Sequence, residues 1–92
     1  MKNIKDKEFV IYSEKYVSLT GKIADGCLSL ESNAYGDDHD SEKHYEFSEE
    51  ETEKLFKLIS IDDFVKLCQK EHLLGMEKFL KDNRIEYSSF TC

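Results

Sequence analysis

The fold is decided between residues 15 and 30, which read KYVSLTGKIADGCLSL. Apolar and polar side chains alternate as far as Ala24, which is typical of a strand buried on one face only. Asp25-Gly26 then supplies a two-residue turn, because both residue types tolerate positive φ. A turn there keeps the apolar side chains of both strands on one face, so we expect a β-hairpin. Its predicted pairs are Ala24 with Cys27, Ile23 with Leu28, and Gly21 with Leu30.

Three further segments outside this hairpin are rich in strand-forming residues. They are residues 9–12, 43–47 and 85–91. Between Leu30 and Lys43 the chain is polar and contains Ser, Asn and Gly, so we expect a loop there.

The hydrophobic pattern changes to a helical period at Ser48, which is followed by three glutamates. Ser48 and Glu51 have the spacing of a capping box, and acidic residues suit the positive end of a helix dipole. Ser60 is placed to cap a second helix. A third apolar repeat begins at Leu73, and Asn83 suits a left-handed helix stop. We therefore expect three helices.

Strands first, then helices, then a final strand predict one α+β domain over residues 1–92. We expect an antiparallel sheet of about five strands with about three helices packed on one face. The predicted core consists of Val17, Leu19, Ile23, Leu28, Leu30, Tyr45, Phe47, Leu55, Phe56, Ile59, Phe64, Phe79, Leu80 and Ile85.

The composition is that of a folded chain, with 39% hydrophobic and 12% aromatic residues beside 36% charged ones. No apolar run approaches the ~20 residues of a membrane-spanning helix. Cys27, Cys68 and Cys92 are widely spaced and odd in number, a pattern that favours reduced thiols. We therefore expect a cytoplasmic protein.

Residues suited to catalysis are sparse. A reactive thiol needs a nearby base or cation to lower its pKa, and no His or Arg cluster accompanies the cysteines in the sequence. The four glycines are scattered, so no phosphate-binding loop is present. Cys68 falls on an apolar helix face and is interpreted as a small core residue, and His72 as a helix-end residue. We expect no enzyme and no cofactor.

Negative charge is concentrated in one stretch of the chain. Nine acids and one lysine between residues 36 and 53 give −8, so the rest of the −7 chain carries +1. Such a field attracts a basic partner and disfavours nucleic acid and anionic membranes. A merely solvated face is the alternative. The expected partner-binding residues are Asp37, Asp38, Asp40, Glu42, Glu46, Glu49 and Glu50, with Tyr35, Tyr45 and Tyr87 as aromatic anchors.

One group within this stretch has side chains that could hold a metal ion. It runs from Asp37 to Asp40, with Glu42 and His44 nearby, and it offers carboxylate and imidazole ligands. The spacing lacks the alternation and the terminal Glu of a calcium loop, and His39 and His44 match no zinc pattern. Metal binding is therefore only an alternative to the binding of a basic partner.

Four segments resemble small bacterial immunity proteins of polymorphic toxin systems, including contact-dependent growth inhibition. They read YVSLTG (16–21), DGCLSL (25–30), HYEF (44–47, leading into the helix at Ser48) and NRIEYSSF (83–90). The resemblance covers most of residues 16–90, and its motifs are structural, so it transfers no functional residue. It implies a protein that binds one cognate toxin, such as a basic nuclease, and covers its active or substrate-binding surface.

Two further classes stay open at this point. Dense carboxylates can imitate phosphates, so the chain could be a nucleic-acid mimic that inhibits a restriction or CRISPR nuclease. The metal-binding protein is the second alternative.

Overall fold

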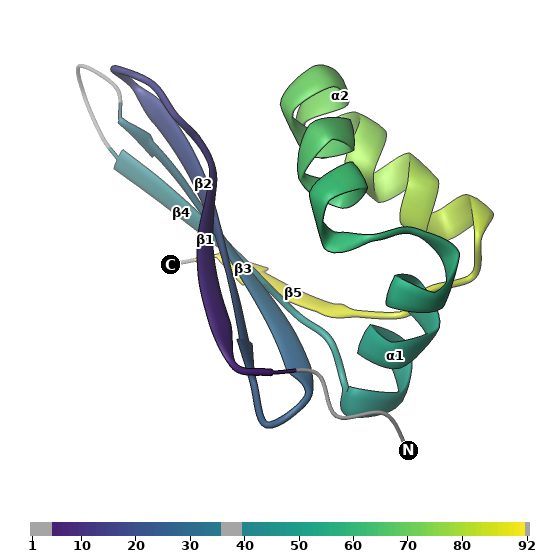
Figure 1. Cartoon of the computed structure of the whole chain (residues 1–92). Helices are drawn as coiled ribbons and strands as arrows, with labels where there is room; N and C mark the ends of the chain where they lie inside the picture. The colour runs from purple at the N-terminus through teal and green to yellow at the C-terminus, as the bar shows by residue number, and fades with distance from the viewer. Residues whose placement is uncertain (1–4, 36–39, 92) are drawn as a thin grey trace.

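The computed structural model of the chain describes residues 5–35 and 40–91. It contains one antiparallel sheet in the order β1-β2-β3-β4-β5, so every strand pairs with its neighbour in the sequence of strands (Figure 1). The strands are β1 (Lys7–Ser13), β2 (Val17–Ala24), β3 (Cys27–Tyr35), β4 (Asp40–Glu46) and β5 (Ser88–Thr91).

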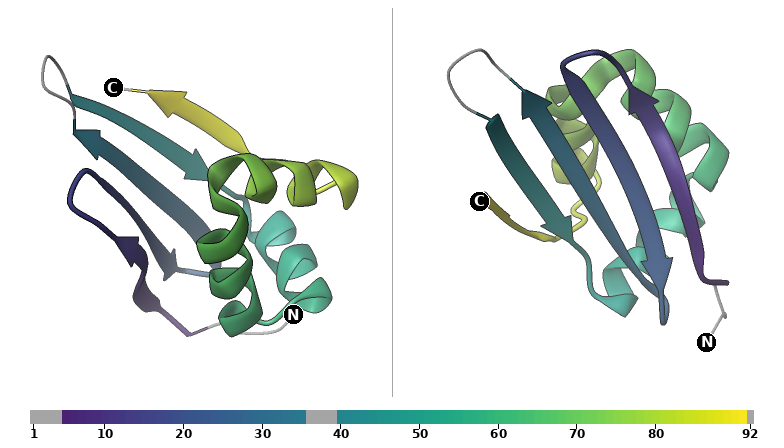
Figure 2. Two further views of the ribbon diagram at one scale, coloured as in Figure 1. Left: turned by 90° about the horizontal axis from the view of Figure 1, so that it is seen from above. Right: turned by 90° about the vertical axis from the view of Figure 1, so that its left-hand side faces the viewer.

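Two helices, α1 (Glu49–Leu58) and α2 (Ile61–Asp82), connect β4 to β5. Both cover the same face of the sheet, and no described element covers the other face (Figure 2, right). The α+β class and the five antiparallel strands agree with expectation. The expected number of helices, three, is wrong.

The hairpin at Asp25-Gly26 has the predicted register, with Ala24 opposite Cys27 and Ile23 opposite Leu28. Asp25 and Gly26 have φ of 54° and 80°, the left-handed values that a tight hairpin turn requires. Because the turn residues set the pairing, this local signal was sufficient to predict the register of β2 against β3.

The predicted loop between Leu30 and Lys43 is wrong over most of its length. β3 continues to Tyr35, and β4 already begins at Asp40. The polar residues of this stretch suit a strand because one face of the sheet is bare, and because β2 needs a partner along its whole length. Ala34, for example, pairs with Val17. Residues 36–39 lie outside the described part.

Both helices begin at the serines expected to cap them. The Ser48 side chain accepts the Glu51 N–H at 3.2 Å, and the Ser60 side chain accepts the Asp63 N–H at 3.1 Å. The capping box is incomplete, because the Glu51 carboxylate accepts the Glu86 N–H at 2.9 Å instead of turning back to Ser48. Glu51 therefore joins α1 to the segment before β5.

The predicted third helix is the second half of α2. The backbone leaves helical geometry at His72 (φ 61°, ψ −163°), and α2 changes direction there (Figure 2, left). A β-carbon on Gly75 would collide with the Glu71 side chain, so a glycine is needed just after the bend. At the C-terminal end the left-handed residue is Arg84 (φ 58°), whereas Asn83 was expected there.

The core lies between the helices and the inner face of the sheet. Most predicted members are buried, while Val17, Phe56, Ile59 and Phe79 are only half-buried. Ile11, Cys68 and Met76 are buried in addition. Ile11 escaped the pattern because the pairing of β1 with β2 shifts between Val10 and Tyr12, which puts adjacent residues on one face. Burial raises the pKa of the Cys68 thiol to about 12, in accord with a structural role.

Side chains of the helical layer also complete hydrogen bonds of the sheet. Thr52 of α1 is buried, and its hydroxyl accepts the Leu28 N–H at 2.9 Å, beyond the end of the β3–β4 pairing. Gln69 of α2 donates to the Ile11 carbonyl at the bulge in β1, at 2.7 Å. Both contacts fix the helices relative to the strands, because unpaired backbone groups would otherwise be buried.

Candidate protein-binding face

The bare face of the sheet is the candidate site. Along β4 the side chains alternate, so Lys43 and Tyr45 point to the helices, while Glu42, His44 and Glu46 point to the bare face. The acidic stretch of the sequence therefore places two of its carboxylates on an uncovered surface.

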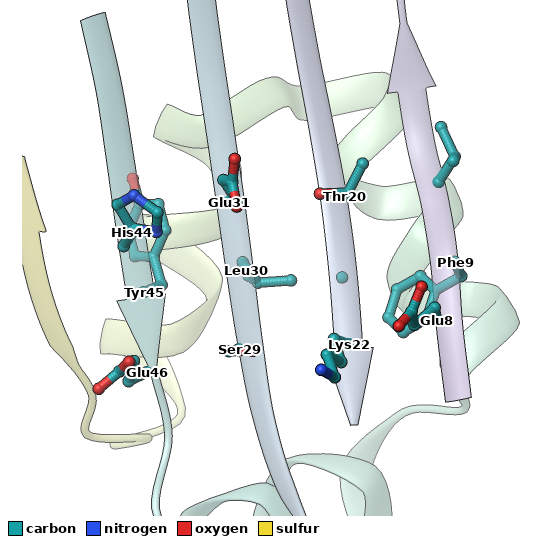
Figure 3. Close-up of a pocket in the computed structure, with 12 residues that line it drawn as sticks. Glu8, Phe9, Thr20, Lys22, Ser29, Leu30, Glu31, His44, Tyr45 and Glu46 are labelled. Carbon is teal, nitrogen blue, oxygen red and sulfur yellow. The ribbon is translucent and has the colours of Figure 1, made fainter. Parts of the chain in front are cut away.

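Cross-strand pairing adds a third carboxylate from β3. Glu31 lies directly opposite His44, while Asn33 is opposite Glu42 and Ser29 is opposite Glu46. Residues directly opposite have Cβ atoms about 5 Å apart, and diagonal neighbours about 7–8 Å. Glu31, Glu42 and Glu46 therefore place three carboxylates around His44 on two adjacent strands. Figure 3 labels His44, Glu31 and Glu46 on these strands.

The His44 ring is held in place on this surface. Its Nε2 lies 3.2 Å from Oε1 of Glu42, and its ring stacks on Phe90 of β5 with centroids 5.0 Å apart. Glu31 accepts a hydrogen bond from Asn33 Nδ2 at 3.1 Å. Glu46 has no hydrogen-bond or ion-pair partner within the described residues. The ordered imidazole and the half-exposed phenyl ring give the acidic surface an aromatic centre.

A shallow hollow of about 590 Å³ extends from this group across β3 and β2 to β1 (Figure 3). Glu8 of β1 lies opposite Lys22 of β2 at its far side. Lys22 is the single cation among the described residues that line the hollow. We call the group Glu8, Glu31, Glu42 and Glu46 the acidic sheet face.

The expected partner-binding residues do not form one patch. Asp37 and Asp38 lie outside the described residues. Tyr35 and Asp40 pair with each other at the ends of β3 and β4. Glu49 and Glu50 are exposed in the first turn of α1, away from the middle of the sheet. Of the expected residues whose side chains the structure describes, Glu42 and Glu46 lie on the bare face.

Tyr45 is a correction to the predicted site. Its side chain is 0% exposed, so it belongs to the core and cannot touch a partner. Its hydroxyl donates to Glu77 of α2 at 2.6 Å, and Lys43 donates to the same carboxylate oxygen at 3.1 Å. Burial, followed by the Glu77 carboxylate, raises the pKa of Tyr45. The hydrogen bond from Tyr45, followed by Lys43, lowers the pKa of Glu77.

Tyr87 was also expected as an anchor, and it is half-buried. Its ring packs against Tyr45 and Phe47, with centroids 5.6 Å and 5.5 Å away. Desolvation by burial raises the pKa of its hydroxyl. Tyr87 therefore serves the core at least in part and lies on the side opposite the acidic sheet face.

Glu8 and Glu31 are the site residues that sequence reasoning missed. Both lie outside the dense acidic stretch, so charge density alone could not indicate them. A usable signal was present for Glu31, because the hairpin register puts Leu28 and Leu30 inward and hence Glu31 outward. The pairing of β3 with β4 could not be predicted, because the residues between Leu30 and Lys43 had been interpreted as a loop.

Within the described residues, no group of three or more His, Cys, Asp or Glu side chains is arranged to hold a metal ion. His39 and the two aspartates before it lie outside those residues. In the same part of the chain, neither helix combines the length and the apolar character needed to cross a membrane.

Comparisons with family models, with curated proteins and with solved structures found no match for this chain.

Proposed function

We propose that this chain is a binding protein, not an enzyme, and that it neutralises a protein toxin with a basic surface, in the manner of bacterial immunity proteins. The observation that carries the proposal is the group of three carboxylates around His44 on an uncovered sheet face. The motif resemblance to immunity proteins adds support. In this role the chain acts in the cytoplasm, where it meets a toxin that has entered the cell.

Charge and shape together favour a basic protein surface as the partner. Carboxylates at Glu31, Glu42 and Glu46 repel one another, so their proximity costs stability in the free chain. Lysine or arginine side chains of a partner would relieve that repulsion through charge-assisted hydrogen bonds. A nuclease uses such cations to hold phosphates, and covering them blocks its substrate. The pleated sheet and Phe90 supply the area between the charges.

The test begins with capture of proteins from the native host on the immobilised chain. The triple variant Glu31→Lys, Glu42→Lys, Glu46→Lys should lose a basic protein that the unaltered chain retains. The control carries the same charge change at exposed sites off the bare face, Glu14→Lys, Asp62→Lys and Glu71→Lys, and should retain that protein.

Association rates of the purified partner then distinguish a specific face from general charge. At low salt the face variant should associate about tenfold or more slowly, and added salt should narrow the difference. Equal rates for the face variant and the control would contradict the proposal. A captured restriction or CRISPR nuclease, in place of a toxin, would make nucleic-acid mimicry the better description.

A further inference from the structure

A second surface, opposite in charge, lies at the edge of the sheet near β5. It is a groove of about 920 Å³ lined by the second half of α2 and by residues 84–87. These residues belong to the segment that connects α2 to β5 (Figure 1). Leu74, Lys78 and Lys81 line it from the helix, and Arg84 and Tyr87 line it from the returning segment. It shares no lining residue with the hollow on the acidic sheet face.

The free charges in this groove are mostly positive. Glu77 is already bound by Tyr45 and Lys43, and Lys78 pairs with Asp82 at 2.9 Å. Within the described residues, Lys81 and Arg84 have no carboxylate at ion-pair distance. The Glu86 side chain is the remaining acid in the lining. Lys81 and Arg84 are both exposed, so their charges are accessible to a ligand in the groove.

The backbone at Arg84 is an independent observation. Arg84 adopts φ 58° directly after α2, a position where glycine is favoured because a β-carbon is strained there. The nearby helix carbonyls already have donors, since Arg84 N–H binds Lys81 O and Ile85 N–H binds Leu80 O. The carbonyls are therefore satisfied by backbone donors, and the Arg84 side chain is exposed and lines the groove.

Apolar surface adjoins these cations. Leu74 is 83% exposed, the most exposed of the large hydrophobic side chains in the described residues. Tyr87 is half-buried in the same lining, and Ile85 forms a buried floor. Leu74 and Lys81 are two helical turns apart, about 10 Å along the axis. Three to four residues of an extended peptide cover that distance.

We propose that this groove binds an extended acidic peptide segment. One apolar side chain of the segment packs on Leu74 and Tyr87, and carboxylates three or four residues away pair with Lys81 and Arg84. The charge preference is opposite to that of the acidic sheet face, so this is a separate binding site. Both sites can be occupied together, because they lie on different sides of the sheet's edge.

The probe is a synthetic peptide with capped ends and the sequence Phe-Ser-Gly-Asp-Glu, titrated into the isotope-labelled chain and followed by NMR. Shifts should be confined to amides of Leu74, Lys81, Arg84 and their neighbours. A matched peptide with lysines in place of the two acids should not shift these amides. The proposal would be overturned if the acidic peptide changed the amide chemical shifts of the acidic sheet face, or if it changed no chemical shifts at all.

Variants test the residues individually. Lys81→Glu with Arg84→Glu should weaken peptide binding by about tenfold or more, because two charge-assisted contacts become repulsive. The matched control, Lys66→Glu with Lys70→Glu, lies on the first half of α2 and should change binding less than about twofold. Leu74→Ser should also weaken binding without affecting the fold, since Leu74 is exposed. Equal affinity of the groove variants and the control would refute the site.

Discussion

At the scale of single residues, the glycine at position 21 is explained by the contact that a β-carbon there would make. Gly21 lies opposite Phe9, and the Phe9 ring fills the space that a side chain at position 21 would take. Position 21 points to the helices, on the same face as the buried Leu19 and Ile23, so the glycine leaves room for the Phe9 ring. Phe9 supplies the missing volume from the edge strand β1.

This arrangement predicts that the effect of Gly21→Ala on the free energy of unfolding depends on Phe9, which a double-mutant cycle can measure. Gly21→Ala should lower the free energy of unfolding by about 1–3 kcal/mol, because the new methyl group displaces the Phe9 ring. In a Phe9→Ala background the same change should be neutral or stabilising, since alanine has less backbone entropy to lose than glycine. Urea unfolding of the four proteins measures both effects, and simple additivity would show that the contact does not matter.

At the scale of elements, α2 consists of two helical halves that meet at a kink at His72. The bend at His72 lets the first half of α2 pack near β1 while the second half brings Glu77 to β4. The His72 ring meets Tyr12 edge-on, with centroids 5.7 Å apart. The positive φ at a non-glycine residue is the local cost of covering a twisted sheet with one helix.

At this bend, glycine should be more stabilising than alanine, which is the reverse of the order in a regular helix. In a regular helix, alanine is favoured over glycine by about 1 kcal/mol. At φ 61° and ψ −163° only glycine is unstrained, so His72→Gly should be more stable than His72→Ala. Lys66, in the regular first half of α2, is the control and should show the usual order. The measurement is the thermal unfolding of the Gly and Ala variants at His72 and at Lys66. If alanine is more stable than glycine at both positions, α2 is straight in solution.

At the scale of the whole molecule, two layers are joined and two surfaces of opposite charge are separated. The molecule measures 45 × 24 × 21 Å, and its strands extend beyond the helices (Figure 1). Tyr45 and Lys43 of the sheet both bind Glu77 of the helical layer. Lys43 is the single lysine between residues 36 and 53, and its ammonium group pairs with Glu77 of α2 instead of a carboxylate of the acidic sheet face.

The link between the layers predicts a pH-dependent stability difference. The folded pKa of Glu77 lies below its ordinary value of 4.5, so its contribution is present above that pH and is lost as the pH falls through the folded pKa. Tyr45→Phe should therefore cost about 1.5–3 kcal/mol at pH 7, and this difference should narrow in acid. Tyr87→Phe is the control, because that hydroxyl makes no hydrogen bond within the described residues. A pH-independent cost for Tyr45→Phe, measured by urea unfolding from pH 3 to 8, would contradict the role of Glu77.

Much of the fold could be predicted because its signals are local. The register of β2 and β3 follows from Asp25-Gly26, and the starts of both helices follow from Ser48 and Ser60. The candidate site could be predicted only in part. Glu42 and Glu46 were found through charge density, whereas Glu31 belongs to the site through strand pairing, and Tyr45 was assigned to it although the pairing turns that side chain inward.

By itself the sequence determined the α+β class, the central hairpin, the helix caps and most of the core, because turn chemistry and side-chain period act over a few residues. Tertiary structure alone decided which carboxylates share a surface, where α2 bends, and how Lys43 and Tyr45 of β4 reach Glu77 of α2. Those features depend on contacts between segments distant in the chain, and only the packed sheet and helices bring such segments together.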